Sequence, residues 1–261
     1  MRKTYYYKDP LNDDFADTNI ATQRLPSDYK YISHDPLKGV WDFLLHHFVA
    51  TPLGFLYQKV IYREQIVNRK VLIPYLLSGC FIYGNHTRAA GDAFTPNIAV
   101  FPRKAYIVTS PDAVSIPGVR NLVKSLGGIP LPNDISGIRR FHSALLQRSK
   151  WNHIVIYPEA HIWPYYTDIR PFKDTSFRYP AEAGKPVFSF TVTYKKRAVG
   201  SFPRTVVYVD GPFFPDKDKT LRENQKMLRD LVYKAMLERS KNSDYNYNNY
   251  VYRPDDTVKG E

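Results

Sequence analysis

The sequence is poor in cysteine, and its most apolar N-terminal stretch is short. The 261 residues include one cysteine, Cys80, so the chain cannot form a disulfide bond with itself, which fits a reducing cytosol. Cys80 precedes an apolar run at residues 81–83, where we expect a buried structural thiol rather than a nucleophile. The uncharged stretch at residues 43–57 is shorter than the roughly 20 residues that a spanning helix needs.

Sequence motifs of several protein classes are also missing. There is no G-x-S-x-G turn and no H-E-x-x-H motif, which argues against a serine hydrolase or a metal-dependent one. No Arg-rich tail, zinc-finger spacing or RNA-binding signature is present, so we expect no nucleic-acid partner. Residues 1–15 lack the apolar core of a secretory signal, so we expect no signal peptide.

What the sequence has in excess is positive charge. Lys and Arg number 37 against 25 Asp and Glu, which gives a formal net charge of +12. The hydrophobic fraction of 43% is typical of an ordinary globular protein. A positive excess favours an anionic partner, such as an anionic membrane or a phosphorylated substrate, although a basic, soluble surface has the same composition.

Residues 38–62 form an apolar segment that is interrupted at Thr51-Pro52. Because proline disrupts a helix interior, we predict two short helices joined there as a helical hairpin. Its aromatic residues, with Lys38 and Lys59 nearby, suit a membrane interface with anionic head groups. A hairpin that packs on its own domain has the same pattern, and the two interpretations are equally favoured.

Further along the chain, short apolar segments alternate with helical patterns. Strands are predicted at residues 80–83, 105–109, 153–157, 187–193 and 205–210, and a helix at 220–240 opens with a capping box of Thr220 and Glu223. This alternation predicts an α/β fold with a mostly parallel mixed sheet flanked by helices. We divide the chain into an N-terminal arm and helical hairpin (1–63), an α/β domain (64–240) and a polar, Tyr-rich C-terminal tail (241–261).

A candidate general base lies where the first of these strands ends. His86 follows this strand and Asp92 stands six residues later; the carboxylate would hold one ring nitrogen protonated and leave the other free to accept a proton. Glu159 follows the strand at 153–157 and is a candidate for binding a substrate hydroxyl, the alternatives being a helix cap or an ion pair. Ligands gather beyond the carboxyl ends of parallel strands, so we expect His86, residues 130–133 and Glu159 to converge.

Three cations are candidates for binding an anionic substrate group. Arg139 and Arg140 lie near a predicted helix start, and Lys173 follows Pro171-Phe172. Arg suits bidentate phosphate binding, and a helix N-terminus adds a favourable dipole. Alternatively, these three side chains lie on the protein surface and contact only solvent.

Taken in order, these segments resemble the glycerolipid acyltransferase family, which includes the 1-acylglycerol-3-phosphate acyltransferases. The resemblance covers roughly residues 75–212. The family motif N-H-x-x-x-x-D is echoed at Asn85–Asp92, and G-x-x-x-x-R at Gly128–Asn133. The motif F-P-E-G is echoed at Tyr157–Ala160, and P-F-K at Pro171–Lys173. The family's proline at a strand entry is echoed at Lys185–Val187.

The sequence departs from these motifs in ways that leave the acceptor open. The interval from His86 to Asp92 is one residue longer than in the family, and we expect Gly91 to absorb the extra residue in a bulged turn. Asn133 stands where the family has an arginine, so Arg139 or Arg140 is expected to supply that cation. Ala160 replaces the glycine of the third motif.

The resemblance implies direct acyl transfer without a cofactor or metal. His86 would deprotonate the hydroxyl of 1-acylglycerol-3-phosphate, oriented by Asp92, and the alkoxide would attack a thioester carried by coenzyme A or an acyl carrier protein, giving phosphatidic acid. Glu159 would position the glycerol, and the substrate-binding set would be completed by Asn133, Arg139, Arg140 and Lys173. The resemblance also implies a peripheral protein at the cytoplasmic face of the cell membrane. The alternatives are an O-acyltransferase of the same fold acting on another lyso-lipid, a glycolipid or a cell-wall polyol, and a non-catalytic lipid-binding protein.

Overall fold

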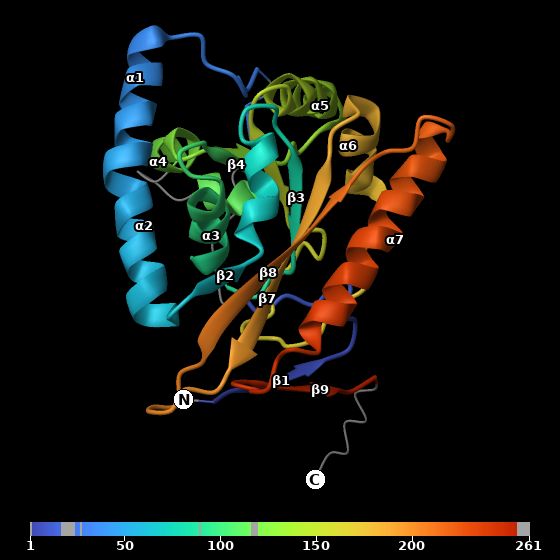
Figure 1. The fold of residues 1–261 in the computed structure, drawn as a ribbon. Helices are drawn as coiled ribbons and strands as arrows, with labels where there is room; N and C mark the ends of the chain where they lie inside the picture. The colour runs from blue at the N-terminus through green and yellow to red at the C-terminus, as the bar shows by residue number, and fades with distance from the viewer. Residues whose placement is uncertain (1, 17–23, 27, 89, 116–119, 255–261) are drawn as a thin grey trace.

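A computed structural model describes residues 2–16, 24–26, 28–88, 90–115 and 120–254 (Figure 1). Its centre is a seven-stranded sheet with the order β2-β8-β7-β3-β6-β4-β5, in which all neighbouring pairs are parallel except β7 and β8. The strands are β2 Gln65–Val67, β3 Phe81–Gly84, β4 Ala105–Thr109, β5 Gly128–Pro130, β6 His153–Ile156, β7 Val187–Lys195 and β8 Arg204–Phe213. The predicted α/β fold with a mostly parallel mixed sheet is confirmed.

Both faces of the sheet are covered, which explains why β3 is buried throughout. On one face, Ile82 packs with Ala99 and Val100 of α3 (Gly91–Val100) and with Leu72 of the 3-10 helix η3 (Arg69–Tyr75). On the other face, Phe81 and Tyr83 pack with residues of three helices, α5 Ile135–Ser149, α6 Arg178–Ala183 and α7 Leu221–Ser240. Helix α7 has the predicted capping box. The shorter elements are η4 Pro111–Val114, α4 Arg120–Ser125 and η5 Thr175–Phe177.

The N-terminal helical segment does not fold back on itself. It runs through α1 (Pro36–Leu44), a π-helix η1 (Leu45–Ala50), α2 (Thr51–Tyr57) and a second π-helix η2 (Gln58–Tyr62) without a turn (Figure 1). The predicted hairpin is therefore wrong. Pro52 lies directly after the wider π-turns of η1, and the helix continues through it.

Much of this helical segment faces solvent with apolar side chains. Helix α1 contains no buried residue, and Leu37, Trp41 and Phe48 are 81%, 62% and 69% exposed. Between residues 36 and 62 the formal charges are Lys38, Asp42 and Lys59 alone. Within the described residues, no helix has the length and apolar character needed to cross a bilayer.

The two ends of the chain pair with each other. Strand β1 (Thr4–Tyr7) forms a parallel two-stranded sheet with β9 (Asn249–Tyr252). Tyr250 of β9 stacks on the buried Trp163, with ring centroids 5.0 Å apart and an interplanar angle of 5°. Part of the predicted tail is thus a docked strand, whereas residues 17–23 of the predicted arm and 255–261 of the tail lie outside the described residues. The division into three parts stays a prediction.

Candidate active site

The backbone that carries His86 is held from several sides. The side-chain amide of Asn85 donates to the carbonyl of Val192 on β7 (3.1 Å) and accepts from its N–H (2.8 Å). The N–H of His86 donates to Glu159 Oε2 (3.1 Å), and its carbonyl accepts from the N–H of Trp163 (3.1 Å). The loop after β3 therefore has little freedom at the histidine.

His86 and Asp92 form the hydrogen bond that the sequence predicts. His86 Nδ1 lies 2.8 Å from Asp92 Oδ2, which also accepts the N–H groups of Thr87 and Arg88, each at 3.0 Å. An acceptor with three donors is fixed in direction, so Nδ1 carries the proton and Nε2 keeps its lone pair. The side chain of His86 is 18% exposed while that of Asp92 is 2% exposed. The pair therefore offers one basic nitrogen to a ligand.

The additional residue between His86 and Asp92 is absorbed before helix α3 rather than in a bulge at Gly91. The N–H of Asp92 donates to the carbonyl of Arg88 (3.1 Å), which closes a turn that leads into the helix. Gly91 is not among the residues with a positive φ. Its requirement is space, because a Cβ there would lie 2.9 Å from the guanidinium carbon of Arg88. The predicted bulged turn is wrong, but the predicted contact forms.

Tyr157, at the end of β6, touches both members of the pair. Its ring stacks on His86 with centroids 4.5 Å apart at 18°, and its hydroxyl donates to the carbonyl of Asp92 at 2.5 Å. Burial raises the pKa of Tyr157 well above its ordinary value, helped by the nearby charge of Asp92. The phenol therefore stays protonated and acts as a donor.

A buried ion pair supports Asp92 from the side away from His86. Arg88 donates to Glu64 Oε2 (2.7 Å) and to Thr95 Oγ1 (3.0 Å), and its Nε lies 3.4 Å from Asp92 Oδ1. Burial disfavours the guanidinium charge, but Glu64 and Asp92 outweigh that effect and raise the pKa of Arg88. Arg88 thus remains a cation inside the protein and lies against the buried carboxyl group of Asp92.

Glu159 is placed differently from its predicted role. Only 3% exposed, it accepts the N–H groups of His86 and Arg170 and lies 3.3 Å from Nη2 of Arg170. Burial raises its pKa, opposed by Arg170 and these backbone donors. The burial of this carboxylate keeps it from a substrate hydroxyl. The structure corrects the assignment: Glu159 holds the two loops together.

The predicted phosphate ligands are not gathered at His86. Arg139 and Arg140 are exposed on α5, which packs on the opposite sheet face from α3, the helix that carries Asp92. Lys173 is exposed next to Phe172, which packs on the α5 side. The side-chain oxygen of Asn133 accepts the N–H of Leu25 (3.2 Å) beyond the edge strand β5, three strands or about 14 Å from β3. The predicted convergence is wrong for Asn133, because the strand order separates it from His86. The roles of Arg139, Arg140 and Lys173 as substrate ligands stay predictions.

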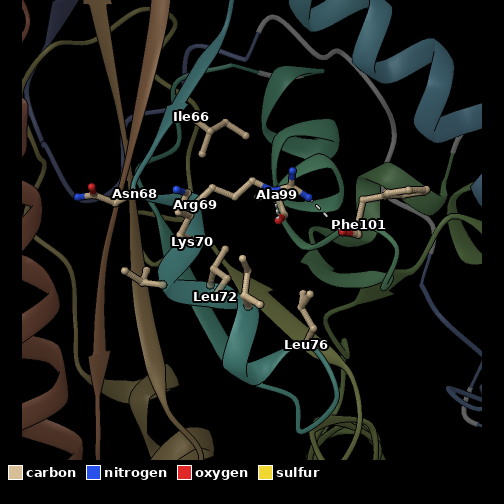
Figure 2. Close-up of a pocket in the computed structure, with 10 residues that line it drawn as sticks. Ile66, Asn68, Arg69, Lys70, Leu72, Leu76, Ala99 and Phe101 are labelled. Carbon is tan, nitrogen blue, oxygen red and sulfur yellow. Dashed lines mark hydrogen bonds between the residues drawn. The ribbon is translucent and has the colours of Figure 1, made fainter.

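An apolar cavity of about 150 Å³ lies along α3, the helix that carries Asp92. Its wall begins at Ala93 and Phe94, directly after Asp92, and continues along β4, β5 and the N-terminal helical segment. A larger groove of about 780 Å³ lies at the other end of α3 (Figure 2). There Arg69 reaches across to donate to the carbonyls of Ala99 (2.8 Å) and Phe101 (3.0 Å). Neither His86 nor Asp92 lines either of these two cavities.

With this geometry in view, comparisons with solved structures find several similar chains, of which two are described here. The 1-acyl-sn-glycerophosphate acyltransferase PlsC from Thermotoga maritima aligns over 81% of this chain and 99% of its own, at 14% identity and a TM-score of 0.47. The pilus retraction motor PilT with bound ADP aligns over 68% and 59%, at 10% identity and a TM-score of 0.25. No family model and no curated protein matches the sequence. At these values neither likeness assigns a function, so the side chains around His86 must do so.

Sequence inspection missed three residues of the site: Arg88, Glu64 and Tyr157. Glu64 and Arg88 are separated by 24 positions, and no spacing motif connects them. Tyr157 does carry a signal, because it ends the strand that precedes Glu159, where it comes close to the end of the neighbouring strand β3.

Proposed function

We propose that the protein is an O-acyltransferase that moves an acyl group from a thioester to an alcohol. The observation that carries this proposal is the 2.8 Å contact between His86 Nδ1 and Asp92 Oδ2, which leaves Nε2 as a general base. The partial exposure of His86 gives an alcohol access to this nitrogen. The apolar cavity along α3, the helix that carries Asp92, suits part of an acyl chain.

In the proposed reaction, Nε2 takes the proton of the acceptor hydroxyl as its oxygen attacks the thioester carbonyl. The tetrahedral intermediate then collapses and the carbon–sulfur bond breaks. The leaving thiolate takes up the proton that His86 had removed from the acceptor. The products are an ester and a thiol. Asp92 stabilises the imidazolium formed in between, and the donor is an acyl-coenzyme A or an acylated carrier protein.

The acceptor is a lipid hydroxyl, and two classes follow from the sequence. One is 1-acylglycerol-3-phosphate, which would give phosphatidic acid; the other is a neutral lyso-lipid, glycolipid or cell-wall polyol. The separation of Arg139, Arg140 and Lys173 from the α3 side of the sheet supports the second class, because these candidate phosphate ligands do not face the base. We therefore place the non-phosphorylated acceptor first.

We further propose that the N-terminal helical segment docks the enzyme on the cytoplasmic face of an anionic membrane. Its exposed apolar side chains, among them Leu37, Trp41 and Phe48, match the face of a helix that lies in the interface. The net charge of +12 adds attraction to anionic lipids and to an acidic carrier protein.

The test is a screen of acceptors with both thioester donors, read by mass spectrometry. Wild type should form an ester with at least one lyso-acceptor, and His86→Ala should lower the rate by about a hundredfold or more. His142→Ala is the matched control, since His142 lies on α5 and contacts Glu182. Equal rates for wild type and His86→Ala would reject the catalytic assignment and leave a lipid-binding protein.

A further inference from the structure

The turn that joins β7 to β8 lies at the sheet edge that carries His86. Strand β7 runs parallel to its neighbour β3, so the residues that follow each strand emerge at the same edge of the sheet. The turn comprises residues 196–203, and the end of β7 contacts the loop after β3 through a hydrogen bond between the hydroxyls of Tyr194 and Thr87 (2.6 Å). The turn therefore borders the loop that holds the candidate base.

Arg197 fastens this turn to the end of the N-terminal helical segment. Its Nη2 donates to the carbonyl of Ile61 in η2 and to that of Pro203 (2.9 Å), and its guanidinium carbon lies 5.1 Å from the centre of the Phe202 ring. Both segments lie at the lower left of Figure 1. Nη1 of Arg197 is neither buried nor hydrogen-bonded to any residue that the structure describes. The guanidinium is thus fixed in place with one nitrogen presented to solvent.

A second cation lies beside this one. Arg63 directly follows η2, is exposed, and forms no ion pair with the residues that the structure describes. Burial lowers the pKa of Arg197 below its usual value, and the charge of Arg63 lowers it further. Two guanidinium groups that repel each other are both stabilised by an anion bound between them, and their planar N–H donors match the oxygens of a phosphate.

The carboxylates near the two arginines have other partners. Residues 195–209 contain no Asp or Glu. Glu64, the neighbour of Arg63 in the chain, is 3% exposed and accepts a hydrogen bond from Arg88 (2.7 Å). Asp244, from the chain after α7, lies 3.1 Å from Nζ of Lys195. Among the described residues, the two arginines therefore have no carboxylate partner, and their charge is available to a ligand.

The surface around the two arginines is apolar. Val199, in the middle of the turn, is 80% exposed, and Val60 and Ile61 of η2 are 59% and 41% exposed. Apolar side chains bordered by cations are typical of a segment that enters the head-group region of an anionic membrane. A nucleic acid or a free anion would gain little from these aliphatic side chains. The chemistry of the surface therefore favours a phospholipid.

We propose that Arg63 and Arg197 bind the phosphate of a lipid head group, and that the β7–β8 turn enters the membrane interface with Val199. This rests on the proposed membrane docking and extends it from the N-terminal helical segment to the sheet edge. The bound lipid belongs to the leaflet and is distinct from the acceptor. The bilayer then covers the edge at which His86 lies, so that a lipid hydroxyl reaches Nε2 without leaving the interface.

Binding to vesicles tests the phosphate site. The vesicles contain phosphatidylcholine with equal fractions of phosphatidic acid or of oleate, which supplies negative charge as a carboxylate. Wild type should prefer phosphatidic acid, and Arg63→Gln and Arg197→Gln should each weaken that binding about fivefold, since a basic residue near the membrane surface contributes about 1 kcal/mol. Arg63 is exposed, so Arg63→Gln keeps the fold even if Arg197→Gln disturbs the turn.

Arg222→Gln is the matched control. Arg222 is exposed at the start of α7, and β8 leads from the turn to the opposite edge of the sheet before that helix begins. Its replacement removes the same charge and should weaken vesicle binding much less. An equal loss in Arg222→Gln, no loss in Arg63→Gln, or the same losses on oleate vesicles overturns the proposal.

Free phosphate is the other source of the same chemistry. Val199→Asp should weaken binding to phosphatidic acid vesicles at least fivefold, because a charged side chain replaces an apolar one in the interface, and should leave the binding of inorganic phosphate unchanged. Vesicle binding that is unaffected by Val199→Asp overturns the lipid assignment in favour of a soluble phosphate. Acyl transfer is measured separately: wild type that binds vesicles through Arg63 but forms no ester rejects the proposed acyltransferase and keeps this site.

Discussion

The hydroxyl of Tyr157 donates to the carbonyl of Asp92 at 2.5 Å while its ring stacks on the imidazole of His86 at 4.5 Å. One side chain from the end of β6 thus fixes the two residues that come from β3 and α3. His86 and Asp92 are therefore held by Tyr157 as well as by their own hydrogen bond. Substitutions of Tyr157 can separate the effect of ring packing from that of its hydrogen bond.

Tyr157→Phe keeps the stacked ring and loses the hydrogen bond, whereas Tyr157→Leu loses both. We expect the acyl-transfer rate to fall about threefold to tenfold in Tyr157→Phe and further in Tyr157→Leu, because one neutral hydrogen bond contributes about 1 kcal/mol. Steady-state kinetics give the values, with an unfolding curve for each variant to show that the fold is kept. A faster Tyr157→Leu than Tyr157→Phe would contradict the stacking role.

Arg88→Gln should destabilise the protein by about 3–5 kcal/mol, because it leaves Glu64 buried without its cation. Glu64→Gln should have a similar effect, and the double variant should recover part of the loss because it no longer contains a buried Glu64 carboxylate without its cation. Urea unfolding measures the free energy of unfolding. Lys241→Gln is the control: its pair with Glu238 is exposed and should leave stability unchanged. Additive losses in the double variant would show that the two residues act separately.

The elements that the sequence predicts correctly are those set by local patterns. The strands that precede His86 and Tyr157 are continuous apolar runs, and the spacing of Thr220 and Glu223 marks the start of α7. The short range from His86 to Asp92 also makes their contact predictable.

What the sequence does not predict depends on strand order and on pairs distant in the chain. Asn133 follows a strand that lies at the sheet edge, and nothing local places β5 three strands away from β3. Glu159 forms an ion pair with Arg170, and its position after a strand does not reveal this partner. Pro52 suggests a break, but the π-turns before it let the helix continue.

Replacing Trp41 and Phe48 together by Ser should remove most binding to vesicles that contain anionic lipid. Both side chains are exposed on the N-terminal helical segment, and each loses a large apolar area that would enter the interface. Co-sedimentation with vesicles measures the bound fraction. Trp151→Ser is the matched control, since Trp151 is 70% exposed but lies after α5. Equal loss of binding in both variants would reject the docking face.

Protein stability should fall as the pH drops from about 6.5 towards 4, in part through His153. Burial lowers the pKa of this residue from 6.5 to about 4. Between these pH values His153 is protonated in the unfolded chain but not in the folded protein. Its contribution is at most about 3 kcal/mol. Unfolding free energies of wild type and His153→Gln at several pH values give the difference. The variant should lose less stability on acidification; parallel curves would show that His153 does not contribute.

Tyr250→Ala should slow acyl transfer without unfolding the protein. Tyr250 stacks on Trp163 and donates to the carbonyl of Pro164 (2.8 Å), and the N–H of Trp163 in turn donates to the carbonyl of His86. Loss of the ring should loosen the loop that supports the base, so we expect faster hydrogen exchange at the Trp163 amide and a kcat several times lower, with KM little changed. Val251→Ala on the same strand, a more exposed position, is the control. A lower kcat without faster exchange at Trp163 would mean that the effect reaches His86 by another route.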